Sequence, residues 1–495
     1  MNYISTRNKN VNVPSAFAIS SGISPEGGLF VPQSFPQLTP ERILKLSKLS
    51  YTERAQNILA DYLTDFTADE LHHCVYGAYT NKFDDDEITH MARLGENVYL
   101  LELWHGPTCA FKDMALQLLP YLLTEAVKKT ASGKESVLLV ATSGDTGKAA
   151  LEGFRDVEGT RIIVLYPQQG ISPMQRLQMV TQEGQNVAVC AIEGNFDDAQ
   201  TAVKEIFANT ALNKLINDAG KQFSSANSIN WGRLVPQIVY YISAYCSLVA
   251  DEEIALGESI NICVPTGNFG NLLAAYYAKR MGLPVAKLIC ASNQNNVLTD
   301  FIKTGTYNKN RDFHTTLSPS MDILISSNLE RLLFALYDND DTAVSTLMQS
   351  LNNDGSYSVS QQVSKALKNE FWAGFCSDKD TSGEIAATFD DYSYLCDPHT
   401  AVAVNVHKQY MQETGDNTKT VIASTASPFK FCGAVLGALG IQLGNTEFEM
   451  AQQLAKLAGC EVPASLAALE GKAPRFTDTC LKNGVLEYVK GQLGL

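Results

Sequence analysis

The stretch HGPTCAFKD, residues 105–113, is the segment around which this chain is organised. A Gly-Pro turn leads to Lys112, and apolar residues at helical spacing follow it as far as Leu122. Pro107 and Thr108 are residue types that commonly open a helix. The sequence therefore predicts that Lys112 lies in or near the first turn of an apolar helix.

That position has chemical consequences for Lys112. The positive end of a helix dipole disfavours a cation, and burial beside Phe111 would add a desolvation cost. Both effects favour the neutral amine, which is the nucleophile that forms a Schiff base. The alternative is an ordinary surface lysine at a helix start, and these nine residues alone do not separate the two interpretations.

Composition limits the function classes. The 495 residues suggest roughly three domains, and 45% hydrophobic with 18% charged residues is ordinary for a globular chain. The net charge of -15 disfavours nucleic acid as a partner. We find no membrane-length apolar run and no secretory or transit-peptide pattern. The 11 cysteines are scattered without metal-ligand spacing, which predicts reduced thiols, a cytoplasmic location and no metal site.

From Asn97 onward, short apolar strands alternate with helices, which is typical of βαβ units and a parallel sheet covered on both faces. We expect strands at 98–103, 137–142, 161–166, 187–192, 260–264, 288–291 and 420–424. We expect helices ending near 154, from 172 to near 184, and at 197–207, 272–281 and 398–407.

Two other regions have different patterns. Residues 1–96 are predicted to form a separate leading module with a Pro-Glu-Gly-Gly turn and helices at 43–49 and 51–63. The acidic run 84–87 is interpreted as a solvated helix start rather than a metal site. Residues 300–395 show the weakest pattern, and 371–393 has the character of an insertion.

Two glycine-containing loops each follow an expected strand and precede an expected helix: TSGDTG at 142–147 and TGNFGN at 266–271. In such loops backbone N–H groups and the helix dipole favour an anion. Neither loop has the spacing of a Walker A or a G-x-G-x-x-G motif. Either alone is also an ordinary strand-to-helix turn, but with an activated lysine they indicate a phosphorylated carbonyl cofactor, or a cofactor and a phosphorylated substrate.

Five further side chains are candidates with two interpretations each. His105 and His399 are candidate bases, although loop histidines are more often hydrogen-bonded framework residues. Asp113 either orients Lys112 or stabilises its own helix start. Arg233 and Lys430 are suited to binding an anion, and each is equally suited to an ordinary ion pair.

The motifs as a set resemble those of threonine synthase, in the longer branch found in many bacteria and in fungi. The resemblance covers nearly the whole length, except for 300–395. The matching segments are STR at 5–7, EGGLFVP at 26–32, HGPTCAFKD at 105–113, TSGDTG at 142–147, NSINWGRLVPQ at 227–237, PTGNFGN at 265–271, DPHTA at 397–401 and STASPFKF at 424–431.

The resemblance implies an α/β fold of fold-type II, the pyridoxal-phosphate-dependent, tryptophan synthase beta-like architecture, with two parallel-sheet domains and an N-terminal α/β module. The implied domains are 1–96 for the N-terminal module, 97–135 and 228–475 for the large cofactor-binding domain with an insertion at about 300–395, 136–227 for the small α/β domain, and 476–495 for a C-terminal tail.

The resemblance also implies roles for individual residues. Lys112 would be the catalytic residue and form the Schiff base with pyridoxal 5'-phosphate. The implied cofactor-binding residues are Lys112, Gly267, Asn268, Phe269, Gly270, Asn271 and Thr425. The implied substrate-binding residues are Ser143, Asp145, Thr146, Asn230, Arg233 and Lys430.

Two of these implied positions carry a physical consequence. Thr425 would bond the pyridine nitrogen, and a hydroxyl there cannot supply the negative charge that keeps a pyridinium protonated. The cofactor ring would then accept electrons less strongly than a protonated pyridinium does. Many relatives in the wider fold-type carry asparagine where Asp145 falls, so a contact between Asp145 and the ring stays open.

The implied reaction converts O-phospho-L-homoserine and water to L-threonine and phosphate by β,γ-elimination and replacement, the last step of threonine biosynthesis. The implied partners are this small molecule, no nucleic acid and no membrane, in a monomer or homodimer. The alternatives are another fold-type II enzyme, such as a threonine or serine dehydratase, and a non-catalytic phospholigand-binding homologue. EGGLFVP, DPHTA and ASPFKF argue against the first alternative, and Lys112 with two intact glycine loops argues against the second.

Overall fold

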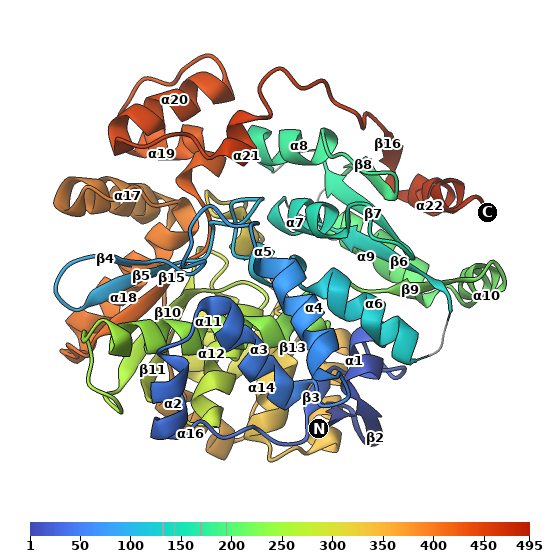
Figure 1. The fold of residues 1–495 in the computed structure, drawn as a ribbon, viewed down its shortest axis with the longest axis horizontal. Coiled ribbons are helices and arrows are strands. Elements are labelled where there is room, and N and C mark those ends of the chain that lie inside the picture. The colour runs from blue at the N-terminus through green and yellow to red at the C-terminus, as the bar shows by residue number, and fades with distance from the viewer. Residues whose placement is uncertain (131–132, 143, 169–170, 195) are drawn as a thin grey trace.

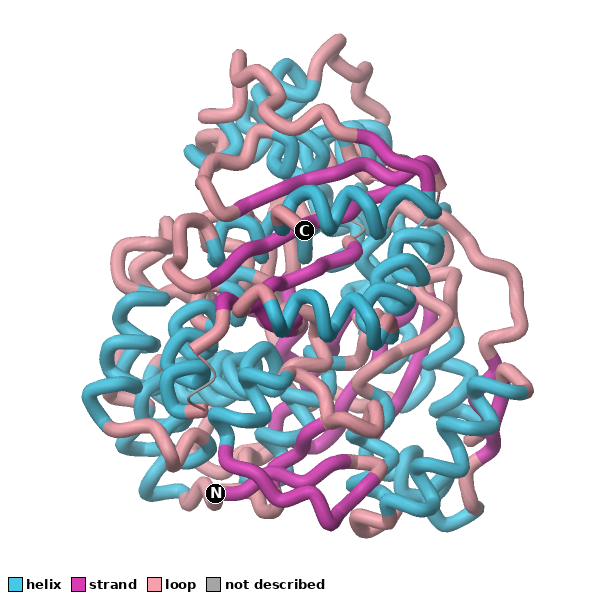
Figure 2. Tube along the Cα trace, turned by 90° about the vertical axis from the view of Figure 1, so that its right-hand side faces the viewer, coloured by secondary structure: helices cyan, strands magenta, loops and turns pink. Residues whose placement is uncertain are grey.

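A computed structural model of the chain describes residues 1–130, 133–142, 144–168, 171–194 and 196–495. Two mainly parallel sheets form two lobes, and an antiparallel sheet lies at the N-terminal end (Figure 1). The turned view in Figure 2 shows the N-terminus beside strands at the lower end of the molecule and the C-terminus nearer its middle. No helix among the described residues is both long and apolar enough to cross a membrane.

The six-stranded sheet of the larger lobe has the order β14-β11-β10-β15-β5-β4. Every neighbouring pair is parallel except β4 with β5. Its strands are β4 (Met91–Arg93), β5 (Val98–Glu102), β10 (Ile260–Pro265), β11 (Val285–Ser292), β14 (Phe371–Phe375) and β15 (Thr420–Ser424).

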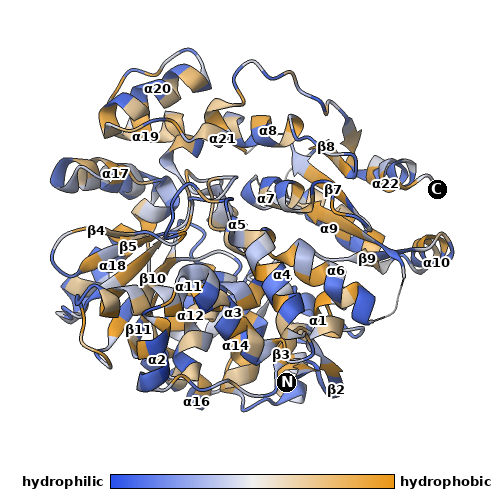
Figure 3. Cartoon of the chain, viewed as in Figure 1, coloured by the Kyte–Doolittle hydropathy of each residue, from blue (hydrophilic) through white to orange (hydrophobic). Residues whose placement is uncertain are grey.

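Helices cover both faces of this sheet. Ile262 and Val264 of β10 share a core with helices α11 (Trp231–Ala250) and α12 (Gly270–Met281), whereas Cys263 between them packs with α18 (Pro398–Thr414). Alternate residues of a strand point to opposite faces, so both faces are buried and the strand must be apolar throughout. Figure 3 shows this as hydrophobic strands inside helices whose outer faces are hydrophilic.

The five-stranded sheet of the smaller lobe has the order β16-β8-β7-β6-β9, with all neighbours parallel. Its strands are β6 (Glu135–Ala141), β7 (Thr160–Pro167), β8 (Val187–Glu193), β9 (Lys221–Ser224) and β16 (Thr479–Leu481). Its helices are α7 (Asp145–Phe154), α8 (Pro173–Val180), α9 (Phe196–Ala208), α10 (Thr210–Asp218) and α22 (Val485–Leu493), with the short η3 (Lys482–Gly484).

The strand β16 corrects one expectation. Residues 476–495 were predicted to be a C-terminal tail, but β16 pairs with β8, and Val485 and Val489 of α22 are buried in the core of the smaller lobe. The segment is therefore an integral edge of this sheet. The other domain limits stay predictions.

The N-terminal module combines the antiparallel sheet β2-β1-β3 with four helices. Its elements are β1 (Asn2–Ser5), β2 (Asn8–Pro14), α1 (Ser15–Ser21), β3 (Phe30–Pro32), α2 (Pro40–Leu46), α3 (Tyr51–Tyr62) and α4 (Ala68–Tyr79). Arg54 of α3 donates hydrogen bonds to the carbonyl and hydroxyl of Ser243 on α11, and Arg7 forms an ion pair with Glu330 at 2.7 Å. The module is thus anchored to the larger lobe by buried polar contacts as well as apolar packing.

The segment 300–395 is not an insertion throughout. β14 pairs with β11 as the edge strand of the main sheet, so Phe371–Phe375 belongs to the core architecture. The elements from α13 through this segment are α13 (Val297–Thr304), β12 (Thr306–Asn308), η1 (Pro319–Met321), α14 (Leu329–Leu336), α15 (Asp341–Asn353), β13 (Ser356–Ser358), α16 (Gln361–Glu370) and α17 (Asp378–Tyr392). Beyond β15 follow η2 (Pro428–Lys430), α19 (Cys432–Ala438), α20 (Glu447–Ala458) and α21 (Ala464–Ala467).

The predicted strands all occur, with limits shifted by a few residues, and several helix predictions change; the helix predicted at 398–407, for example, runs to Thr414. The helix after Lys112 is split into α5 (Asp113–Leu116) and α6 (Leu119–Lys129), because Pro120 has no N–H to donate to the Leu116 carbonyl. The helix that begins at Pro173 ends at Val180 rather than near residue 184. The acidic run 84–87 starts no helix; it forms turns.

Candidate active site

A cavity of about 780 Å³ is lined by residues of both lobes and of the N-terminal module. The loops after β5, β6, β10 and β15 all reach it, which places it at the carboxyl ends of parallel strands, where open α/β sheets bind ligands. Lys112, the loop 265–271 and Thr425 are among the lining residues. The structure therefore gathers the main elements of the predicted site.

Lys112 lies immediately before α5, as expected, and its side chain is 9% exposed. Its Nζ donates to Ser320 Oγ at 3.1 Å and lies 3.4 Å from Asp145 Oδ2. Burial lowers the pKa of Lys112, the attraction of Asp145 opposes this, and the nearby cations Lys430 and Arg233 add to the lowering. The site thus favours the neutral amine.

The loop Thr266–Asn271 is shaped by two features. Phe269 adopts a left-handed backbone (φ 62°), which lets the chain turn into α12. A Cβ added to Gly267 would lie 2.8 Å from the Ser320 carbonyl oxygen, so that position has room for glycine alone.

Asn271 at the end of this loop is oriented by its neighbours. Its Oδ1 accepts hydrogen bonds from the hydroxyls of Tyr240 and Tyr241, each at 2.5 Å. Its amide nitrogen is buried and has no partner among the described residues. A buried donor without a partner in the wall of a cavity indicates a place for an acceptor, such as an anion.

Asp145 begins α7 and is buried beside Lys112 rather than in the cavity lining. Its Oδ1 accepts from Lys430 at 2.7 Å and from Gln175 at 2.8 Å, and its Oδ2 accepts from Ser320 at 3.2 Å. Burial alone would raise the pKa of Asp145, but Lys430 and Lys112 outweigh it and hold that pKa well below its usual range.

Besides Asp145, two other expected substrate residues do not line the cavity. Lys430 is fully buried, and its Nζ is bound to the Thr108 carbonyl at 2.8 Å as well as to Asp145. Asn230 caps α11: its side chain accepts from the Gly232 N–H and donates to two backbone carbonyls. Because their polar atoms form hydrogen bonds or ion pairs inside the protein, neither residue is placed to hold the substrate phosphate.

Arg233 does line the cavity, from the first turn of α11. Its Nη1 donates to the Ala226 carbonyl at 2.8 Å, and its buried Nε has no partner among the described residues. Burial lowers the pKa of Arg233 to about 10, so it stays charged at neutral pH. A buried guanidinium with a free N–H in a cavity wall is suited to an anion. Thr146 also lines the cavity, and Ser143 lies outside the described residues.

Some lining residues were not predicted. Lys204 of α9 adds a cation from the smaller lobe, Glu26 reaches in from the N-terminal module, and Ser320 contacts Lys112. Ser320 lies in the segment whose sequence has no clear period, so no local pattern marked it. Glu26 belongs to the EGGLFVP segment, which was quoted for the resemblance but given no role.

His399 and Asp113 act as framework residues. His399 Nδ1 pairs with Asp397 at 2.7 Å, and its Nε2 accepts the backbone N–H of Ser320 at 3.2 Å, which fixes a neutral ring with the proton on Nδ1. Asp113 accepts from the N–H and hydroxyl of Thr108. Burial raises the pKa of Asp113 to about 6, although these bonds oppose the rise. Asp113 thus braces the loop rather than orienting Lys112.

His105 is held between two carboxylates. Its Nδ1 lies 2.7 Å from Asp84 and its Nε2 lies 2.8 Å from Glu102. Burial alone would lower the pKa of His105, but the bonds and charges of these two acids raise it to about 9. At neutral pH His105 is therefore a cation that fixes the start of the loop, and it is not a base.

We expect His105→Gln to remove a pH dependence of stability. Because the folded-state pKa of His105 is raised, its contribution is present below its unfolded value of about 6.5 and is lost as pH rises through about 9. The contribution is at most about 3 kcal/mol, and screening at the exposed Asp84 reduces it. Urea unfolding should show the difference between wild type and variant shrinking from about pH 6 to about pH 9.5. The same change at the exposed His72 should leave the profile unaltered; equal profiles for wild type and H105Q would contradict the assignment.

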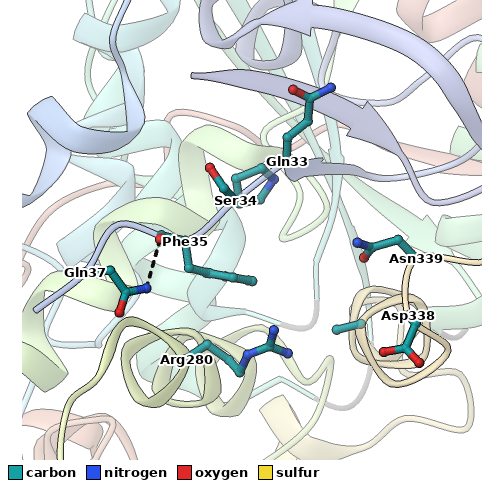
Figure 4. Close-up of a pocket in the computed structure, with 9 residues that line it drawn as sticks. Gln33, Ser34, Phe35, Gln37, Arg280, Asp338 and Asn339 are labelled. Atoms are coloured by element: carbon teal, nitrogen blue, oxygen red, sulfur yellow. Dashed lines mark hydrogen bonds between the residues drawn. The ribbon is translucent and has the colours of Figure 1, made fainter.

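A second pocket, of about 360 Å³, lies between the N-terminal module and α14 (Figure 4). Arg280 extends across it, with its guanidinium 5.2 Å from the centre of the Phe35 ring. Arg280, Gln33 and Asp338 are all exposed to solvent. This pocket shares no lining residue with the larger cavity and has no buried charged group, so the candidate active site is the larger cavity.

Three family models match the chain. The one described as pyridoxal-phosphate dependent enzyme covers residues 87–425. Those described as threonine synthase N terminus and threonine synthase, C-terminal cover residues 2–79 and 400–485.

Individual proteins are similar over most of the chain. Threonine synthase of Pseudomonas aeruginosa is 39% identical over 88% of this chain and 90% of its own length. Human threonine synthase-like 1 is 40% identical over 86% of this chain, which spans 58% of that protein's length. The structure of PLP-bound threonine synthase from Brucella melitensis is 36% identical, with a TM-score of 0.88 over 99% of both chains. Yeast threonine synthase gives the same TM-score at 32% identity, over 100% of this chain and 99% of its own.

Proposed function

Because this chain belongs to the threonine synthase family of pyridoxal-phosphate-dependent enzymes, we propose that it converts O-phospho-L-homoserine and water to L-threonine and phosphate. The observation that carries the proposal is the buried amine of Lys112 in a cavity whose wall includes the glycine loop Thr266–Asn271. A desolvated amine and an anion-binding turn in one cavity are what a phosphorylated aldehyde cofactor requires.

The residues present fit pyridoxal 5'-phosphate. Lys112 would bind its aldehyde carbon, and the loop Gly267–Asn271 would hold its phosphate through backbone N–H groups and the free amide donor of Asn271. Thr425, which also lines the cavity, would offer a neutral hydroxyl to the ring nitrogen. When bound, the cofactor supplies an electron sink for negative charge on the substrate carbon beside the amine.

Lys112 is proposed to move the protons of the reaction. Its neutral amine can remove a proton from the substrate and return it at a neighbouring carbon, because one flexible side chain reaches both positions. Ser320, at 3.1 Å from Nζ, orients that amine between transfers.

Arg233 is proposed to bind the substrate phosphate, with Lys204 as a second cation on the other side of the cavity. Both line the cavity, from α11 and α9 respectively. A guanidinium offers forked donors that match phosphate oxygens. Thr146, which lines the cavity, would lie nearer the amino-acid end of the substrate, and Asp145 would stay behind Lys112, outside the lining.

Assay of the purified protein with O-phospho-L-homoserine tests the proposal. Phosphate and threonine should be released in equal amounts and only after loading with pyridoxal 5'-phosphate. Release of a keto acid from threonine or serine would instead support a dehydratase. Cofactor binding without any phosphate release would support a non-catalytic homologue. The cytoplasmic location and the monomeric or homodimeric state stay predictions from the sequence.

A further inference from the structure

Three charged side chains meet at the wall of the cavity: Lys112, which lines it, and Asp145 and Lys430, which are buried behind the lining. The exposed fractions of their side chains are 9%, 2% and 0%. Two lysines thus share one buried carboxylate, and that carboxylate can neutralise one of them fully. Burial makes an uncompensated charge costly, so the way in which Asp145 is shared decides which lysine stays charged.

The contacts of Asp145 are unequal. Its Oδ1 lies 2.7 Å from Lys430 Nζ and also accepts from Gln175 at 2.8 Å. Its Oδ2 lies 3.4 Å from Lys112 Nζ, beyond the 2.7–2.9 Å typical of a charge-assisted hydrogen bond. Lys430 also donates to the Thr108 carbonyl at 2.8 Å, which a charged ammonium does well. Asp145 therefore forms its closer ion pair with Lys430 rather than with Lys112.

We propose that Lys430 is a positioning residue that holds the Asp145 carboxylate away from Lys112, so that Lys112 keeps the neutral amine required by its reaction with the cofactor. The inference rests on the proposed function in one respect, namely that Lys112 reacts as an amine. Lys430 itself is not among the residues that line the cavity.

The other groups around Lys112 agree with this assignment. Arg233 is a second cation across the cavity, Ser320 and Thr425 are neutral, and His399 is held as a neutral ring behind Ser320. Burial is the largest cause that lowers the pKa of Lys112, and Lys430 and Arg233 act in the same direction against Asp145. Among the described residues, Asp145 is the carboxylate that contacts Lys112 and acts to keep it protonated, while Glu26 and Asp322 line the same cavity.

Substitutions at the pair should move the protonation of Lys112 in opposite directions. Lys430→Met removes a repelling cation and frees Asp145 to pair with Lys112, which favours the ammonium. Asp145→Asn removes the attracting carboxylate and favours the amine. The double variant D145N/K430M removes both effects and should lie between the two single variants.

The experiment measures how fast the full-length apoprotein captures pyridoxal 5'-phosphate as a function of pH, from the absorbance of the Schiff base. The rate follows the fraction of Lys112 that is the neutral amine. For K430M we expect the apparent pKa of capture to rise by about one unit, with about tenfold slower capture below it. For D145N it should fall, and for D145N/K430M it should lie between the values of the two single variants.

A buried lysine outside the pair provides the matched control. Lys148 on α7 forms its own ion pair with Glu152 at 2.9 Å, so Lys148→Met should leave the pH profile of capture unchanged. Circular dichroism and thermal melting report whether each variant is folded. If K430M does not fold, the double variant must still capture the cofactor with a higher apparent pKa than D145N.

An unchanged profile in K430M would overturn the proposal, as would a double variant whose profile matches that of K430M. The capture assay contains no O-phospho-L-homoserine, so its result does not depend on whether the protein makes threonine. The two proposals are therefore tested separately.

Discussion

Replacing Lys112 with alanine should lower turnover of O-phospho-L-homoserine by about 10⁴-fold, because the variant loses the side chain proposed both to bind the cofactor and to move the protons. The absorbance of the bound Schiff base should disappear at the same time. Both effects are measured on one preparation, by phosphate release and by the visible spectrum after loading with pyridoxal 5'-phosphate.

Borohydride reduction of the loaded wild-type protein, followed by peptide mapping, identifies the lysine directly. The label should lie in the peptide that contains Lys112. Lys82 is the control, since partial burial also lowers its pKa but it lies outside the cavity lining. Lys82→Met should keep the label and the activity; a label on another lysine, or near-normal turnover in K112A, would overturn the site.

Arg233→Met should lower kcat/KM for O-phospho-L-homoserine by about a hundredfold. The buried guanidinium has a free Nε in the cavity wall, and removing the cation from a desolvated pair with phosphate costs about 3 kcal/mol. Inhibition by inorganic phosphate should weaken in parallel, while the amount of bound cofactor should stay the same. Steady-state kinetics with and without added phosphate measure both.

The stability of the same variant separates binding from folding. Arg233 has no carboxylate partner among the described residues, so its buried charge is uncompensated until an anion binds. R233M should therefore unfold at the same or a higher urea concentration than wild type when no substrate is present. Arg280→Met, in the exposed pocket of Figure 4, is the matched control and should retain full activity. An equal loss in both variants would contradict a specific role for Arg233.

The sequence predicted well wherever the determining contacts are local. The position of Lys112 before a helix, the glycine turn before α12 and the helix start at Ser172 each depend on residues within a few positions of one another. The apolar strands were recognisable for a similar reason, since a strand buried on both faces leaves a continuous apolar run. In segment 300–395 the apolar run of β14, FWAGF, was not recognised as a strand, and the Ser320 loop carries no such local signature.

Local sequence patterns could not distinguish the roles of Arg233, Asn230 and Lys430 from one another. All three are polar residues in motifs of the same family, yet one lines the cavity, one caps a helix and one neutralises Asp145. Ser320 meets Lys112 across 208 positions of sequence.

By itself, then, the sequence determined the strands and turns, the family and the candidate lysine. The tertiary structure decided which charged side chains face the cavity and which are neutralised by partners inside the protein. The physical reason is that hydrogen bonding within a turn is set by neighbouring residues, whereas the balance of buried charges is set by whichever elements the packing of the two sheets brings together.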